Sequence, residues 1–145
     1  MKDKNSKLNR NELVAPCGLN CRFCYRYLRK KNSCPGCRGD DSLKLKSCLN
    51  CQIKNCERVK NEQIEFCSEC DKFPCNLVKN LDKRYRNSYR ISVIENLNYL
   101  MKYGVERFVG EEERRWVCSK CHELLCMHEL LCRHCEEPRF KEKKV

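Results

Sequence analysis

The sequence contains few of the residues that build an ordinary hydrophobic core. Among 145 residues there are one Trp, five Phe and six Tyr, and sixteen of the residues counted in the hydrophobic 41% are Cys. Charged residues make up a further 35%. Because such a chain buries little apolar surface, we expect it to need covalent or metal cross-links, and the cysteines are their obvious source.

Long apolar runs are also lacking. No stretch reaches the roughly 18 apolar residues that a membrane-spanning helix needs. Residues 1–15 are rich in Lys, Asn and Arg and contain no apolar core of the kind found in secretory signals. We therefore expect a cytoplasmic protein without membrane contact, in a reducing compartment where disulfides do not persist. This expectation favours metal-bound thiolates over disulfides.

Motifs of common enzyme classes are missing as well. There is no P-loop, no dinucleotide-binding fingerprint and no serine nucleophile elbow. The three His all lie in residues 118–135, far along the chain from the first eleven cysteines. Zinc held by four thiolates has no open position and is usually structural. The sequence therefore leans against an enzyme but leaves the question open.

Composition divides the chain into parts that predict its organisation. The parts are a polar lead-in (1–16), a Cys-rich metal-binding module (17–75), a helical segment (76–117), a zinc-ribbon-like element (118–136) and a charged tail (137–145). The predicted fold is a small metal-stabilised α+β class. It combines an irregular Cys-rich zinc-knuckle module, central helices and a C-terminal zinc-ribbon-like element.

Three helices are predicted within or close to the helical segment. The first spans about residues 75–89. Ser92 and Glu95 form a capping box at the start of the second, and Gly104 is placed to end it. A third runs from Val105 into residues 111–115. Apolar residues recur at helical spacing, as expected for helices that pack together: Leu77, Val78, Leu81, Tyr85, Ile94, Leu97, Leu100 and Met101.

Six Cys-x2-Cys pairs are the strongest signal in the chain. Two residues between cysteines let a tight turn, or knuckle, direct both sulfurs at one ion, and zinc takes four such ligands in a tetrahedron. One pair is a weak indication, whereas six in a chain of this length are a strong one. The pairs are Cys21/Cys24, Cys34/Cys37, Cys48/Cys51, Cys67/Cys70, Cys118/Cys121 and Cys132/Cys135.

The zinc-ribbon-like element holds two of these knuckles, separated by a short loop. Its predicted ligands are Cys118, Cys121, Cys132 and Cys135. The glycine that usually follows each knuckle is absent, since His122 and Glu136 occupy those places. For the three His a solvated or supporting role is favoured over metal ligation: His122, His128 and His134.

The first eleven cysteines allow several groupings. Chain order assigns one ion to Cys34, Cys37, Cys48 and Cys51, and a second ion to Cys56, Cys67, Cys70 and Cys75. It leaves a trio, Cys17, Cys21 and Cys24, with no His nearby. Sixteen cysteines would fill four sites of four ligands each. Cys126, or His128 in its place, could therefore reach back as the fourth ligand of the trio. Interleaved groupings remain open.

The trio also allows an iron–sulfur cluster. Its spacing, with Phe23 before the last cysteine, resembles the cluster loop of radical S-adenosylmethionine enzymes. That resemblance covers eight residues, and the chain that follows is too short for their barrel. A simple iron–sulfur cluster at Cys17, Cys21 and Cys24 is the alternative, because thiolate sets of this type serve both metals.

A family resemblance covers about residues 13–110. It rests on Ala15-Pro16-Cys17-Gly18-Leu19-x-Cys21-x2-Cys24, Cys34-Pro35-Gly36-Cys37-Arg38, Cys48-x2-Cys51-x-Ile53-x2-Cys56 and Cys67-x2-Cys70-x2-Phe73-Pro74-Cys75. The chain resembles an uncharacterised cysteine-rich family of bacteria and archaea, a domain of unknown function described as zinc-binding, with the zinc-ribbon-like element as an extension. The resemblance implies metal binding at the matched cysteines and no particular chemistry.

The formal net charge of +11 invites a nucleic-acid interpretation. Basic residues that could contact phosphates, with tyrosines among them, are Arg26, Arg29, Lys30, Lys83, Arg84 and Arg86. The competing interpretation is a solvated surface plus compensation of thiolate charge. Sixteen bound thiolates and four divalent ions would lower the net charge to about +3.

The functional hypothesis is an intracellular module that binds several zinc ions, mainly as structural metals, and interacts with protein or nucleic acid. The alternative is an iron–sulfur protein in electron transfer or redox sensing. The sequence does not indicate the oligomeric state or identify the partner.

Overall fold

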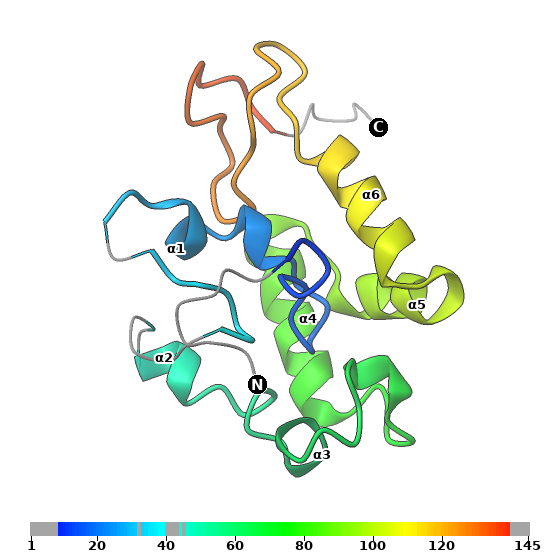
Figure 1. Cartoon of the computed structure of the whole chain (residues 1–145). Helices are drawn as coiled ribbons and strands as arrows, with labels where there is room; N and C mark the ends of the chain where they lie inside the picture. Colours follow the sequence, from blue (N-terminus) through cyan, green and yellow to red (C-terminus); the bar gives the residue numbers. More distant parts are fainter. Residues whose placement is uncertain (1–8, 32, 40–43, 45, 140–145) are drawn as a thin grey trace.

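The first half of the chain is built from short helices and turns, and three longer helices follow (Figure 1). The computed structural model describes residues 9–31, 33–39, 44 and 46–139. In chain order the helices are η1 (Cys21–Phe23), α1 (Tyr25–Leu28), α2 (Lys46–Leu49), α3 (Glu57–Lys60), η3 (Cys67–Glu69), α4 (Asn76–Tyr89), α5 (Val93–Tyr103) and α6 (Val105–Arg115).

The β part of the expected α+β class is wrong for the described residues. They contain no strand, and their β-pairing consists of isolated bridges: Val14–Asn20, Val117–Leu124 and Leu131–Pro138. Each bridge closes a tight turn that contains at least one cysteine, so the chain reverses before a ladder of paired residues can extend. The described fold is small, cysteine-rich and mostly helical.

The three longer helices form where the sequence predicts them. Helix α4 coincides with the helix expected over residues 75–89. The Ser92 side chain accepts a hydrogen bond from the Glu95 N–H at the start of α5, and Gly104 ends that helix with φ 87°. The apolar stripe of α5 is shorter than expected, since Leu100 is buried but Met101 is 62% exposed.

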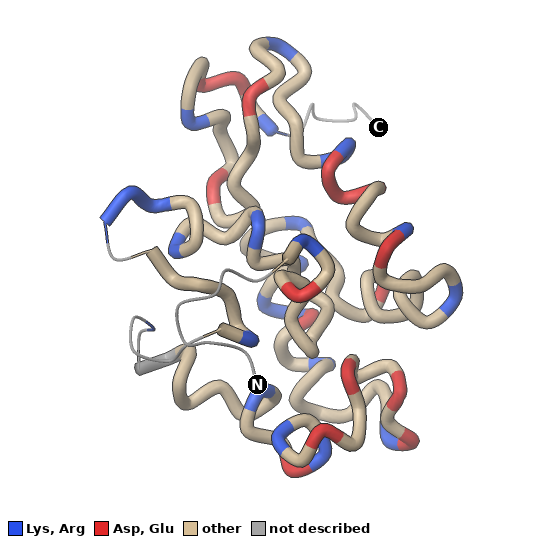
Figure 2. Tube along the Cα trace, viewed as in Figure 1, with Lys and Arg blue, Asp and Glu red and all other residues tan. Residues whose placement is uncertain are grey.

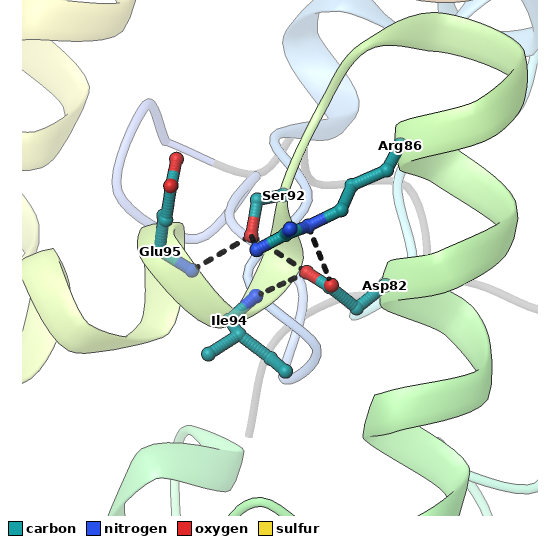
Figure 3. A network of polar contacts seen from close by, with 5 residues as sticks. All are labelled: Asp82, Arg86, Ser92, Ile94 and Glu95. Carbon is teal, nitrogen blue, oxygen red and sulfur yellow. Dashed lines mark hydrogen bonds and ion pairs between the residues drawn. The ribbon is translucent and has the colours of Figure 1, made fainter.

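A buried carboxylate joins α4 to the beginning of α5 (Figure 3). Asp82, on α4, is 6% exposed and accepts hydrogen bonds from Ser92 Oγ at 2.6 Å and from the Ile94 N–H at 3.0 Å. Arg86, one turn further along α4, forms an ion pair with the other oxygen of Asp82 at 2.8 Å. The carboxylate thus satisfies amide and hydroxyl donors at a helix N-terminus, where negative charge is favoured.

The turn of residues 13–21 packs against α5. Gly18 has φ 89°, and a Cβ at that place would lie 3.0 Å from Leu97 Cγ. Asn96 Nδ2 donates to the Gly18 carbonyl at 3.0 Å, and the Cys67 N–H donates to the Pro16 carbonyl at 2.9 Å. Close backbone approach therefore holds this cysteine-bearing turn between α5 and η3.

A second buried cluster attaches residues 116–139 to the rest of the molecule. The rings of Phe23 and Trp116 stack with centroids 5.8 Å apart. The Met127 N–H donates to the Phe23 carbonyl at 2.8 Å, and Arg139 Nη2 donates to the Tyr89 carbonyl. In the described part of the chain, no helix is both long and apolar enough to cross a membrane.

Candidate metal centres

Four sulfur atoms gather beyond the end of α6. The Sγ atoms of this C-terminal site all lie within 4.8 Å of one another: Cys118, Cys121, Cys132 and Cys135. The Cys118–Cys135 and Cys121–Cys132 pairs of sulfurs are each 3.6 Å apart. Disulfide sulfurs lie about 2.05 Å apart, and all sixteen cysteines of the chain are free thiols. The C-terminal site could therefore hold a metal ion.

The two halves of the C-terminal site are the same tight turn. In the first half the Cys118 N–H donates to the Glu123 carbonyl at 2.8 Å, and the second half repeats this bond at the same length. His122 and Glu136, which follow the knuckles, adopt φ of 62° and 65°. The left-handed conformation that favours Gly is therefore present at both places, although neither residue is Gly.

Backbone N–H groups stabilise the ionised form of the sulfurs. Those of Cys121 and Lys120 donate to Cys118 and lower its pKa to about 6, and the knuckle of Cys132 repeats the effect. A backbone N–H acts the same way at Cys121, but burial and the neighbouring thiols outweigh it and raise the pKa to about 12. Four sulfurs this close cannot all ionise without a cation among them, and a divalent metal supplies that charge.

The structure also brings together the second group expected from chain order. The four cysteines line one cavity, the four-cysteine cavity, among apolar side chains: Cys56, Cys67, Cys70 and Cys75. Burial, with the charge of Cys75, raises the pKa of Cys67 to about 12. Arg58, a residue that the sequence did not single out, donates to Cys70 Sγ at 3.2 Å and pairs with Asp71.

A third gathering of thiols, the five-cysteine cavity, combines cysteines from three different pairs. They are Cys21, Cys24, Cys34, Cys37 and Cys48. Cys21 Sγ and Cys37 Sγ lie 3.5 Å apart, and Arg26 Nη1 donates to Cys48 Sγ at 2.6 Å. The hydrogen bond from Cys21 and the charges of Lys44 and Lys54 lower the pKa of Cys37 to about 7. Basic side chains therefore stabilise the ionised form of Cys37, whereas burial raises the pKa of Cys24 and Cys34.

Two groups expected from chain order do not line one cavity together, and their grouping around an ion stays a prediction. Cys51 is absent from the lining of the cavity that holds its pair partner Cys48, and Cys17 is absent from the cavity that holds Cys21. Burial and the charges of Cys37, Cys51 and Cys67 raise the pKa of Cys17. Cys17 is therefore influenced by a thiol from each cavity, Cys37 and Cys67. Chain order does not predict which cysteines line one cavity, because segments distant in the chain fold against each other.

Cys126 and His128 belong to the C-terminal segment that packs on η1 and α1. Cys126 is 1% exposed, and its role as a metal ligand stays a prediction. Both ring nitrogens of His128 have partners, because the Tyr25 N–H donates to Nδ1 at 3.4 Å and Tyr85 Oη lies 2.9 Å from Nε2. Burial lowers the pKa of His128 to about 4. The ring is therefore neutral and in keeping with a supporting role.

The six basic residues proposed to contact nucleic acid differ in their surroundings. Arg26 is bonded to Cys48 and Arg86 to Asp82. Lys30, Lys83 and Arg84 are exposed, and Arg29 is half-buried. Figure 2 shows an uninterrupted basic stretch after α1, whereas basic and acidic residues alternate along α6. Part of the basic excess is therefore bonded to a cysteine sulfur and to a carboxylate within the molecule.

The N-terminal half resembles a known family. Residues 13–80 match the family model described as "Protein of unknown function (DUF3795)". This match confirms the resemblance to a family of unknown function over the stretch that holds the first eleven cysteines, although it ends within α4 and not near residue 110. The C-terminal site lies outside it. No curated protein and no solved structure matches the chain.

Proposed function

We propose that this protein is a zinc-stapled module whose metal ions are structural and whose folded surface binds a protein or a nucleic acid. The C-terminal site and the four-cysteine cavity each supply four thiolates for one ion. Further cysteines of the N-terminal half serve additional zinc. Few apolar residues are available to hold the short helices α1, α2 and α3, so metal binding would contribute much of the folding free energy there.

The geometry of the C-terminal site is the observation that carries this proposal. Four sulfurs at about 2.3 Å from a tetrahedral zinc ion lie about 3.8 Å from one another. The two 3.6 Å sulfur pairs nearly match that spacing before any ion is added. Two knuckles with repeated backbone bonds hold the sulfurs in place, so metal binding needs little rearrangement.

A single zinc ion fits this spacing better than an iron–sulfur cluster does. A cluster places several iron and sulfide atoms between its thiolates, so its cysteines stand farther apart than ligands of one ion. Four protein ligands also complete the coordination of zinc and leave no position for a substrate. The C-terminal site therefore supports a structural metal and not a catalytic one.

Metal analysis of anaerobically purified protein tests the proposal. We expect a colourless protein with several zinc ions per chain by elemental analysis and native mass spectrometry. Cys121→Ser is expected to lose one zinc ion, whereas Ser119→Ala, an exposed position within the same knuckle, is expected to keep the full number. Brown protein containing iron and sulfide would contradict the zinc assignment and support the iron–sulfur alternative.

The nature of the partner is tested through exposed charge. Lys83 and Arg84 lie on α4, and both are exposed. If the partner is a nucleic acid, zinc-loaded protein should bind single-stranded oligonucleotides with an affinity that falls steeply with salt, and Lys83→Gln/Arg84→Gln should reduce both affinity and salt dependence. Binding that is absent at low salt would leave a protein partner as the proposal.

A further inference from the structure

The five-cysteine cavity holds one more thiol than a tetrahedral ion can use. An ion that uses only these thiols takes four of the five, and the choice decides which cysteine stays outside the metal. The question rests on the proposed function, since it assumes that zinc is the ion. The C-terminal site provides a template, because its four sulfurs are already in position.

Spacing along the chain does not make the choice. Ten residues separate the two knuckles of the C-terminal site, and ten also separate Cys37 from Cys48. Nine residues separate Cys24 from Cys34. Both neighbouring pairs of knuckles are therefore compatible with a two-knuckle zinc site. Chain order alone does not distinguish Cys34/Cys37 paired with Cys21/Cys24 from Cys34/Cys37 paired with Cys48/Cys51.

Sulfur positions distinguish the two possibilities. In the C-terminal site the first cysteine of the first knuckle lies 3.6 Å from the second cysteine of the second knuckle. Cys21 and Cys37 hold the same two places when the knuckles Cys21/Cys24 and Cys34/Cys37 are taken together, and their sulfurs are 3.5 Å apart. All four cysteines of these two knuckles line the cavity.

The knuckle formed by Cys48 and Cys51 contributes only one of its two cysteines to the cavity lining. Cys48 lines the cavity but Cys51 does not, so only one sulfur of this pair faces the cavity. Arg26, at the beginning of α1, instead donates to Cys48 Sγ at 2.6 Å and is itself bonded to the hydroxyl of Tyr25. Cys48 Sγ therefore has a hydrogen-bond donor that does not require a metal.

We propose that Cys21, Cys24, Cys34 and Cys37 bind one zinc ion, which draws their sulfurs together, and that Cys48 is a non-ligand thiol held by Arg26. Nearby charge suits the assignment. Lys44 Nζ donates to the carbonyls of Cys37 and Gly39 at 2.8 Å and 2.9 Å, beside a zinc–thiolate centre whose formal charge would be −2.

The backbone donors around these sulfurs match those of the C-terminal site in one of the two knuckles. The N–H two residues after the cysteine donates to sulfur at Cys118 and Cys132. The same relation recurs at Cys34, the first cysteine of its knuckle, whereas in the knuckle Cys21/Cys24 it is found at the second cysteine, Cys24. Donors of this kind orient a thiolate toward its metal and reduce its negative charge.

Two substitutions in the same cavity test the assignment by zinc count. Native mass spectrometry of zinc-loaded protein should show one zinc ion fewer in Cys21→Ser than in the unchanged protein, and the full number in Cys48→Ser. Loss of one zinc ion from Cys48→Ser with full retention in Cys21→Ser would overturn the proposal. Loss of the ion from both variants would also overturn it, because Cys48 would then be a ligand.

Alkylation of the unchanged, zinc-loaded protein gives a second readout that does not depend on a variant folding. Treated with N-ethylmaleimide and mapped by mass spectrometry, Cys48 should be modified at least tenfold faster than Cys21, Cys24, Cys34 or Cys37. Slow modification of Cys48 together with fast modification of one of the other four would contradict the ligand set.

The two proposals fail in different ways. If the protein binds zinc and Cys121→Ser loses one ion, but the Cys21 and Cys48 variants contradict the ligand set, the zinc module stands and only this assignment falls. If the purified protein holds iron and sulfide, the proposed function falls and this assignment falls with it.

Discussion

The C-terminal site and the five-cysteine cavity differ in how their sulfurs are assembled. The C-terminal site takes four sulfurs from residues 118–135, in two turns that repeat the same backbone bonds. The five-cysteine cavity takes its thiols from residues 21–48 and depends on contacts with Arg26 and Lys44. A local site preforms on its own turns, whereas a dispersed site forms only when its segments fold against each other.

Metal removal should expose this difference most strongly. A strong chelator is expected to unfold residues 17–75, because structural zinc sites contribute about 10–16 kcal/mol each. Helices α4, α5 and α6 share apolar contacts and should keep part of their amide protection. Hydrogen exchange followed by mass spectrometry measures both regions at once. Equal retention of protection in the two regions after complete metal removal would refute the comparison.

The carboxylate of Asp82 offers a substitution that acts on the junction of α4 and α5 and not on the C-terminal site. Asp82→Ala removes the acceptor of the Ile94 N–H and of Ser92, so we expect unfolding to become easier by about 2–3 kcal/mol. The zinc of the C-terminal site should be unaffected. Thermal unfolding of zinc-saturated protein measures the effect, and Lys83→Ala, at an exposed neighbouring position, is the control.

Gly18 tests the close packing of the N-terminal turn on α5. Gly18→Ala places a Cβ 3.0 Å from Leu97 Cγ at φ 89°, so we expect a loss of about 1–3 kcal/mol. Gly110→Ala is the matched control, because its Cβ meets nothing within 4 Å and Ala favours a helix. Thermal midpoints should move in opposite directions, and a shift in the same direction would argue against close packing at Gly18.

The smallest effect is expected in the C-terminal site, where Gly should be better than the native residues. His122→Gly and Glu136→Gly relieve φ of 62° and 65°, and each should stabilise the site by about 0.5–1 kcal/mol. Extraction of zinc by a coloured chelator should then slow down. Ser119 does not have a positive φ, so Ser119→Gly should speed up zinc extraction. If Ser119→Gly slowed extraction equally, relief of the positive φ could not be the cause.

Local signals in the sequence predicted the helices well. The Ser92 cap, the apolar spacing of α4 and the terminating Gly104 all act through neighbouring residues, so they can be read from a short window. The exposed Met101 shows where this reasoning ends. Whether the last residue of an apolar stripe is covered depends on the length of the helix packed against it, which periodicity does not contain.

The same distinction between local and long-range contacts explains which cysteine groups could be predicted from the sequence. The number of Cys-x2-Cys pairs and the grouping of Cys118, Cys121, Cys132 and Cys135 follow from the sequence, because a knuckle is a local turn and a short loop limits its partners. Only the tertiary structure decided that Cys21 meets Cys37 and that Arg26 meets Cys48. Several pairings satisfy the same spacing, and packing between distant segments selects among them.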